Sequence, residues 1–121
     1  MSPLKKIIAF ILGAFMILAG VTHLVNPGLS SGLIPDFLPE TLVHIIFFII
    51  EAGLGIAVFV PKWRNKALLG IFILMIFFLP IHIIDVTRDQ PVIGSFTAAV
   101  IRIPIQLLFI FLAWFAKGKS V

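Results

Sequence analysis

The sequence predicts an all-α integral membrane protein, an up-down four-helix bundle with an interfacial cap between the first and second helices. Composition and the length of the apolar segments carry this prediction. Of the 121 residues, 61% are hydrophobic and 12% are charged, and the mean hydropathy is +1.24. Soluble domains hold about 45–50% apolar and about 25% charged residues, and a chain of this size has too much surface to hide the excess from water. We therefore expect one domain, residues 1–121, whose apolar side chains face lipid.

Four apolar segments define the expected helices, at residues 4–25, 41–60, 66–86 and 96–116. Each can cross about 30 Å of hydrocarbon at about 1.5 Å per residue. Segments rich in Pro, Gly and charge separate them, and such residues end helices. Lipid admits only helices and closed barrels, and continuous apolar runs of this length favour helices. The first segment follows two lysines, as in a signal peptide, but its apolar stretch is too long for one, so we expect a retained helix.

The connection between the first and second helices, residues 26–40, is apolar but contains three prolines that exclude a long regular helix. We expect it to lie as a cap over the outer mouth of the bundle; an ordinary loop that dips its leucines into the headgroups is the alternative. The later connections are shorter and favour antiparallel neighbours. The apolar side chains expected in the cap are Leu29, Leu33, Ile34, Phe37 and Leu38.

Basic residues predict the orientation of the helices. Seven of the nine Lys and Arg flank helix ends on one side, Arg88 lies on the other, and Arg102 falls inside the fourth helix. Because Lys and Arg concentrate on the cytoplasmic side, we expect a multi-pass cell-membrane protein with both termini in the cytoplasm. Trp63 and Trp114 fall at the same boundary, where Trp is enriched. The seven residues are Lys5, Lys6, Lys62, Arg64, Lys66, Lys117 and Lys119.

The composition also excludes several function classes. The chain has no cysteine, so it cannot carry disulfide exchange or thiolate chemistry. The net charge of +4 arises from residues that flank the helices, so nucleic acid is not an expected partner. The expected partners are the lipid bilayer and either another membrane protein or further copies of this chain.

The few polar residues inside the apolar segments are the informative ones. Glu51 falls near the middle of the second helix, where a charge costs roughly 2.5–3.5 kcal/mol on insertion scales. We expect it to face the bundle interior together with Gly55, one turn further along. Gly53 and Ala57 have the small-xxx-small spacing that lets a neighbouring helix approach closely.

Five side chains in the outer half of the bundle form the expected ligand-binding site. Arg102 and Gln106 lie one turn apart on one stripe of the fourth helix, and we expect Arg102 to be coupled to Glu51 directly or through water or a ligand. The alternatives are a structural Glu51–Arg102 ion pair and histidines that merely meet interfacial water, His44 above all. No two histidines are three or four residues apart, so no metal site is expected. The expected site residues are His23, Glu51, His82, Arg102 and Gln106.

Several short motifs occur in a fixed order along the chain. They are GVTHLVNPG at 20–28, LIPDFLPE at 33–40, EAGLGIAVFVPKWR at 51–64, LPIHI at 79–83 and RIPIQ at 102–106. On these motifs the sequence resembles the DoxX-like family of small four-helix membrane proteins over nearly its whole length. The family pattern of a His before Asn-Pro, a Glu in the second helix and Arg-x-Pro-x-Gln in the fourth maps onto His23, Glu51, Arg102, Pro104 and Gln106.

The resemblance implies several kinds of function. Some DoxX-like proteins are linked with respiratory or thiosulfate:quinone oxidoreductase complexes, some with oxidative-stress complexes, and distant animal relatives look like assembly chaperones. It thus implies a redox-associated subunit that binds quinone or another small amphipathic ligand in the outer half of the bundle. A non-enzymatic assembly factor or accessory subunit and a small oligomeric transporter are the alternatives, so enzymatic activity stays open. The cysteine chemistry of vitamin K epoxide reductase-type proteins does not carry over.

The orientation can be tested with a phosphatase reporter that is active only outside the cytoplasm. Fused after Val121, it is expected to stay inactive, because seven basic residues flank that side against one on the other. The same reporter fused after Asp89 of a shortened chain is the control and is expected to be active. Activity of the Val121 fusion would show that the helix count or the orientation is wrong.

Overall fold

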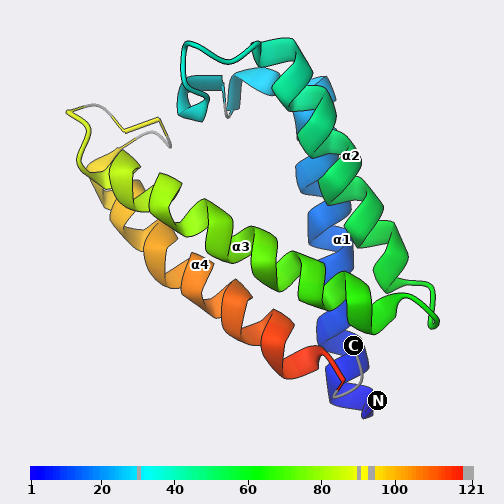
Figure 1. Cartoon of the computed structure of the whole chain (residues 1–121). Helices are drawn as coiled ribbons and strands as arrows, with labels where there is room; N and C mark the ends of the chain where they lie inside the picture. The colour runs from blue at the N-terminus through cyan, green and yellow to red at the C-terminus, as the bar shows by residue number, and fades with distance from the viewer. Residues whose placement is uncertain (30, 90, 93–94, 119–121) are drawn as a thin grey trace.

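The computed structural model describes residues 1–29, 31–89, 91–92 and 95–118, and the regular structure within them is entirely helical. The long helices are α1 (Pro3–Val25), α2 (Glu40–Val58), α3 (Arg64–Val86) and α4 (Phe96–Ala116) (Figure 1). All four are long and apolar enough to cross a membrane. The predicted all-α class and the four apolar helices are confirmed, and the predicted bounds differ from those observed by at most two residues. Lys119 and Val121 lie outside the described residues.

Local chemistry sets the helix ends. The side chains of Ser2 and Ser95 accept hydrogen bonds from backbone N–H groups in the first turns of α1 and α4, as N-cap residues do. At the C-terminal end of α2, Arg64 Nε donates a hydrogen bond to the Val58 carbonyl at 2.8 Å. This bond satisfies one of the carbonyls that a helix end leaves without an intrahelical partner, and it joins the end of α2 to the start of α3.

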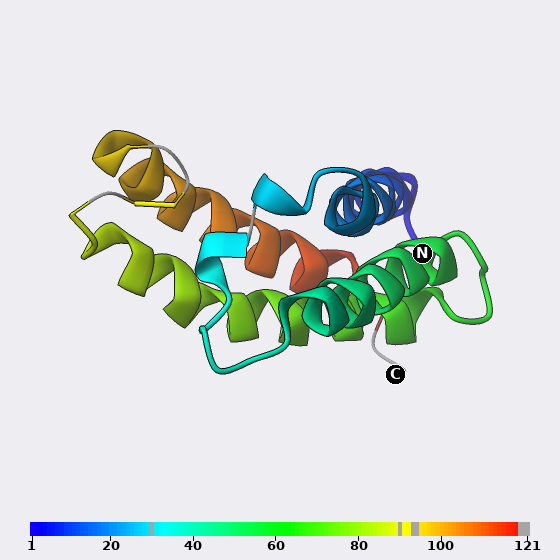
Figure 2. The ribbon, with the colours of Figure 1, turned by 90° about the horizontal axis from the view of Figure 1, so that it is seen from above.

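The helices are arranged as two pairs. α1 packs mainly on α2 and α3 mainly on α4, and fewer contacts join α2 to α3 and α1 to α4. Figures 1 and 2 show the pairs crossing near the start of α1 and diverging toward the end that carries residues 26–29 and 31–39. The start of α1, the end of α4 and the 59–63 connection lie at the crossing end.

The hydrophobic core sits at this crossing end. Its larger members, Leu12, Met16, Leu68 and Ile71, are almost completely buried, and alanines fill the space between them. Toward the opposite end the buried side chains become polar. Apolar packing therefore holds the two pairs together at one end and leaves them separated at the other. The buried polar or charged residues are His44, Glu51, Asp85 and Gln106.

Glycines allow α1 and α2 to approach very closely. A Cβ added to Gly55 would lie 2.6 Å from the Gly13 carbonyl oxygen, and one added to Gly20 would lie 2.8 Å from the Ala52 nitrogen. The expected contact through Gly53 is wrong, because a Cβ there would meet nothing within 4 Å. Gly53 lies on a different face of α2 from Glu51 and Gly55, and spacing alone does not say which face the neighbour meets.

The segment between α1 and α2 bridges the open ends of the two pairs. It contains two short 3-10 turns, η1 (Pro27–Leu29) and η2 (Ser31–Leu33). A Cβ on Gly32 would lie 2.9 Å from Val92 Cγ2, so η2 touches the connection between α3 and α4. We call residues 26–29 and 31–39 the cap. The expectation that Phe37 helps to cover the mouth is wrong, because 84% of its surface is exposed.

The close contact of α1 with α2 predicts opposite effects for two neighbouring glycines. Gly55→Ala is expected to lower the free energy of unfolding in detergent by about 1–3 kcal/mol, the usual cost of overpacking, because its methyl group meets backbone atoms of α1. Gly53→Ala is the matched control and is expected to cause no loss. Equal losses in the two variants would contradict this packing.

Candidate functional site

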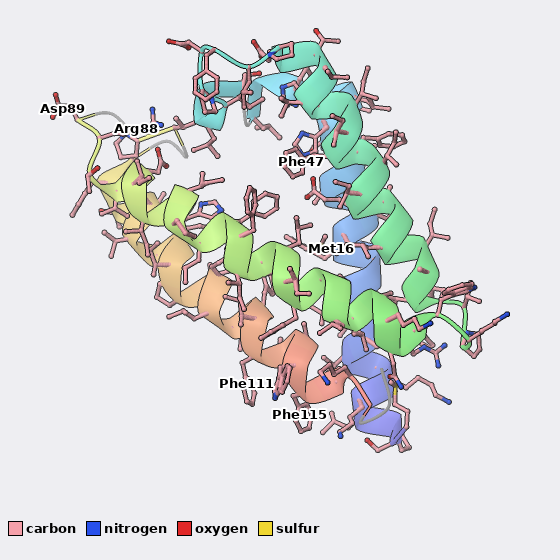
Figure 3. The ribbon with its side chains drawn as sticks, in the orientation of Figure 1. Met16, Phe47, Arg88, Asp89, Phe111 and Phe115 are labelled. Atoms are coloured by element: carbon pink, nitrogen blue, oxygen red, sulfur yellow. The ribbon has the colours of Figure 1, made fainter. Side chains whose placement is uncertain are left out.

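A cavity of ≈ 500 Å³ lies between the two helix pairs below the cap. Figure 3 shows Phe47 on the side of α2 that faces α3, whereas Phe111 and Phe115 lie on the outer side of α4. Along α3 the wall includes Phe77 and Ile84, which are 58% and 56% exposed, so the cavity opens at the side of the molecule. The cap contributes Leu29, Leu33, Ile34, Pro35 and Leu38 to its lining.

One wall of the cavity carries a hydrogen-bonded pair between α1 and α2. His23 Nε2 lies 2.7 Å from Glu51 Oε2, and both residues line the cavity. The close approach at Gly20 and Ala52 brings these flanking positions within reach of each other. Glu51, expected near the middle of the second helix and facing inward, is buried there with a partner.

His23 also contacts His44, which is not among the expected site residues. The two Nδ1 atoms are 2.8 Å apart, and His44 Nε2 lies 3.1 Å from Ser31 Oγ and 3.7 Å from Glu40 Oε1. His44 is buried, which makes the expectation that it meets interfacial water wrong. Its spacing could have indicated that His44 belongs to the site, because His44 and Glu51 are seven residues apart and therefore share one face of a helix.

Arg102 and His82 line the same cavity from the other helix pair. The expected direct pair of Arg102 with Glu51 is not formed, because Glu51 bonds to His23 instead. The Arg102 guanidinium lies 5.7 Å from the centre of the Phe109 ring, and its buried Nη1 has no hydrogen-bond partner among the described residues. A buried donor without a partner is costly. Arg102 as a residue lines the cavity, and its guanidinium can only donate hydrogen bonds to an acceptor there. Coupling of Arg102 to Glu51 through such a ligand stays a prediction.

Gln106 is buried on the predicted inward stripe of α4 but does not line the cavity. Its Nε2 donates to the Met75 carbonyl at 2.7 Å and contacts Met75 Sδ at 3.3 Å. Within the described chain its Oε1 has no partner. Gln106 therefore joins α4 to α3 below the cavity, and its place in the expected polar network with His82 is not supported by contacts.

Asp85 and Arg88 form a polar pair near the end of α3. Asp85 Oδ1 accepts a hydrogen bond from the Val92 backbone at 2.8 Å and lies 3.3 Å from Arg88 Nε. Arg88 also lines the cavity. Since Val92 also touches Gly32 of the cap, Asp85 positions the connection that closes the open end.

The chemistry available at this site is ligand binding and proton exchange. In the part of the chain that the structure describes, no group of three His, Asp or Glu residues is arranged to hold a metal ion. The cavity instead combines apolar rings with a His–Glu pair on one wall and an Arg and a His on the other. His23 and Glu51 can both take up and release protons, whereas Arg102 can only donate hydrogen bonds.

Comparison with known proteins places the chain in one family. It belongs to the family described as a domain of unknown function, DUF8561, whose model matches residues 12–117. The matched range contains every side chain named in the cavity. No curated protein matches the chain, and neither does any solved structure.

The bond between His23 and Glu51 predicts that these two residues are energetically coupled. Each single change, His23→Gln or Glu51→Gln, alters one member of a close polar pair, and the double change alters both. The double variant is expected to lose less unfolding free energy than the two single variants lose in total, by about 0.5–3 kcal/mol. Denaturant titration in detergent measures it.

The matched comparison is the pair Glu51→Gln and Arg102→Gln. Without added ligand these two changes are expected to add within about 0.5 kcal/mol, because the side chains share no direct bond. Losses of unfolding free energy that simply add for His23→Gln and Glu51→Gln would contradict the pairing seen in the structure. Strongly non-additive losses for Glu51→Gln and Arg102→Gln would also contradict it.

Proposed function

We propose that this chain is a small multi-pass membrane protein that binds an amphipathic ligand of the quinone class between its two helix pairs. The observation that carries the proposal is a ≈ 500 Å³ cavity into which polar groups converge from both pairs. Ligand sites are typically apolar cavities of about 300–1,000 Å³ with a few polar groups that fix orientation. This cavity has that size and that composition.

The lining favours a flat, mostly apolar ligand with hydrogen-bond acceptors. Phe15, Phe47, Phe77 and Phe78 line the cavity, and the ring centroids of Phe47 and Phe78 are 5.4 Å apart. Aromatic rings pack well against another ring. Arg102, which lines the cavity, favours a carbonyl or other acceptor oxygen on the ligand, because its guanidinium can only donate hydrogen bonds. A quinone ring combines these properties.

The distribution of charge supports a membrane orientation with both termini in the cytoplasm. Lys62 and Lys66 lie over the Trp63 ring, and Lys117 lies over the Trp114 ring. Trp is enriched at both membrane boundaries, and Lys is in excess on the cytoplasmic side, so these residues together favour a cytoplasmic boundary at this end. We accordingly propose an up-down topology in which the cap and the open ends of the helix pairs face outward.

We further propose that the chain is DoxX-like and acts as a redox-associated subunit. Support comes from the position of three motif residues: His23, Glu51 and Arg102 lie far apart in sequence and line one cavity. A redox role requires an electron carrier from the ligand or a partner, since the protein contributes binding, orientation and electrostatics around it. An assembly factor would need an outer surface that binds another membrane protein, not polar groups lining a cavity. The cavity therefore favours a ligand-binding, redox-associated subunit.

Filling the cavity predicts loss of quinone binding. Ala19 lines the cavity and Ala14 lies on the exposed side of the same helix. In nanodiscs, Ala19→Phe is expected to weaken binding of decylubiquinone at least tenfold, because the added ring takes the ligand's space, whereas Ala14→Phe keeps the affinity of the unmodified protein. Equilibrium binding of labelled quinone measures both.

Mass spectrometry of a lipid extract gives an independent readout of the same proposal. Quinone that co-purifies with the unmodified protein and is depleted in Ala19→Phe supports it. Equal quinone retention in Ala19→Phe and Ala14→Phe would contradict binding in this cavity. A stoichiometric membrane-protein partner without any bound quinone would favour the assembly-factor alternative.

A further inference from the structure

A continuous series of hydrogen-bonding groups leads from the cap to the cavity. Ser31 Oγ lies 3.1 Å from His44 Nε2, the two histidine Nδ1 atoms are 2.8 Å apart, and His23 Nε2 lies 2.7 Å from Glu51 Oε2. At the outer end, Glu40 lies 3.7 Å from His44 and its side chain is 55% exposed. Every group between this surface carboxylate and the cavity is therefore within hydrogen-bonding reach of the next, except for the longer Glu40–His44 step.

We propose that His44 and His23 relay protons between the outer surface and Glu51, so that the cavity exchanges protons with the water above the cap. The relay deepens the proposed function, on which it rests, by adding a proton path to the ligand site. Imidazole suits such a path because one ring nitrogen can accept a proton while the other releases one. Both histidines have both ring nitrogens engaged along the series.

The bond directions are fully determined when Glu51 is a carboxylate and both histidines are neutral. The carboxylate only accepts, so His23 Nε2–H donates to it and His23 Nδ1 must accept. His44 Nδ1–H then donates to His23, and His44 Nε2 is left as an acceptor. The Ser31 hydroxyl can donate to this nitrogen. Each group in the series thus has one consistent orientation.

Addition of one proton at the outer end reverses every bond in the series. The proton binds His44 Nε2, the proton on His44 Nδ1 moves to His23 Nδ1, and the proton on His23 Nε2 moves to Glu51. The histidines are again neutral and Glu51 has gained the proton, so charge and protons balance. His44 Nε2–H now donates to Ser31 Oγ, whose hydroxyl can turn to the Pro27 carbonyl at 2.8 Å. The structure thus provides an acceptor for the serine in both states.

The groups around the series fit a path that begins at the cap. Glu40 is the exposed carboxylate next to His44, and it can collect protons from water. Asp36 of the cap is exposed as well but has no contact with either histidine among those described. His82, Arg88 and Arg102 line the cavity from the other helix pair, and Asp85 is engaged with Val92 and Arg88. A ligand held there would exchange protons with Glu51.

The first test asks whether the central bond exists in solution. In protein whose histidine rings carry ¹⁵N, held in phosphatidylcholine nanodiscs, the shared proton should produce a scalar coupling between the Nδ1 atoms of His23 and His44. His82 has no such partner and serves as the internal control. Separate titration of the His23 and His44 rings without this coupling would overturn the relay.

The second test measures how fast Glu51 takes up a proton after a pH jump. The infrared carbonyl band of protonated Glu51 is assigned by comparison with Glu51→Gln, and no quinone is added. His44→Gln can still bond to His23 but cannot pass a proton, and is expected to slow the appearance of this band at least tenfold. Uptake at the unmodified rate in His44→Gln would show that protons reach Glu51 through the cavity mouth and would overturn the relay.

A matched pair of surface variants tests the same proton path without changing His44, in case His44→Gln does not fold. Glu40→Gln removes the carboxylate beside His44 and is expected to slow uptake several-fold, whereas Asp36→Asn removes another cap carboxylate and leaves the rate unchanged. Equal rates in these two variants would count against the relay. Because none of these measurements uses a quinone, a failed relay and a failed quinone site give different results.

Discussion

The contact of α1 with α2 through glycine is the constraint on which the rest of the structure depends. Backbone atoms of Gly13 and Gly55 meet without side chains between them, and Gly20 lies against Ala52. Small residues at such positions let helices pack closely without help from the hydrophobic effect, which is absent between helices in lipid. Only at this separation can His23 reach both Glu51 and His44 by direct hydrogen bonds. The polar wall of the cavity is thus a product of backbone packing.

The uneven distribution of packing explains where the cavity lies. Leu12, Met16, Leu68 and Ile71 fill the crossing end, and interiors packed in this way leave little free space. At the other end the helix pairs diverge and polar groups replace the apolar core. The cap then joins the pairs through Gly32 and Val92. Apolar packing joins the helix pairs at one end of the molecule, and the cavity lies at the other end.

Much of this could be predicted from the sequence, because hydrophobic segment length and helix-breaking residues are local properties. The helix bounds followed from them, and the inward direction of Glu51 and Gln106 followed from the cost of placing polar groups against lipid. The pairing of side chains did not, because it depends on how far two helices approach and at what rotation. Long-range charge attraction suggested Arg102 as the partner of Glu51, but Gly20 places His23 closer. The seven-residue spacing of His44 and Glu51 predicts a shared face, yet only the tertiary contact shows that the face is covered.

The side opening along α3 has a consequence for how the cavity would be filled. Phe77 and Ile84 belong both to its wall and to the exposed apolar surface of the helix. In a bilayer such an opening faces the acyl chains, so a hydrophobic ligand would diffuse in from the lipid phase. Occupancy would then follow the mole fraction of ligand in the membrane, and its aqueous concentration would matter only through partitioning. A ligand too insoluble to exist free in water could still saturate this protein.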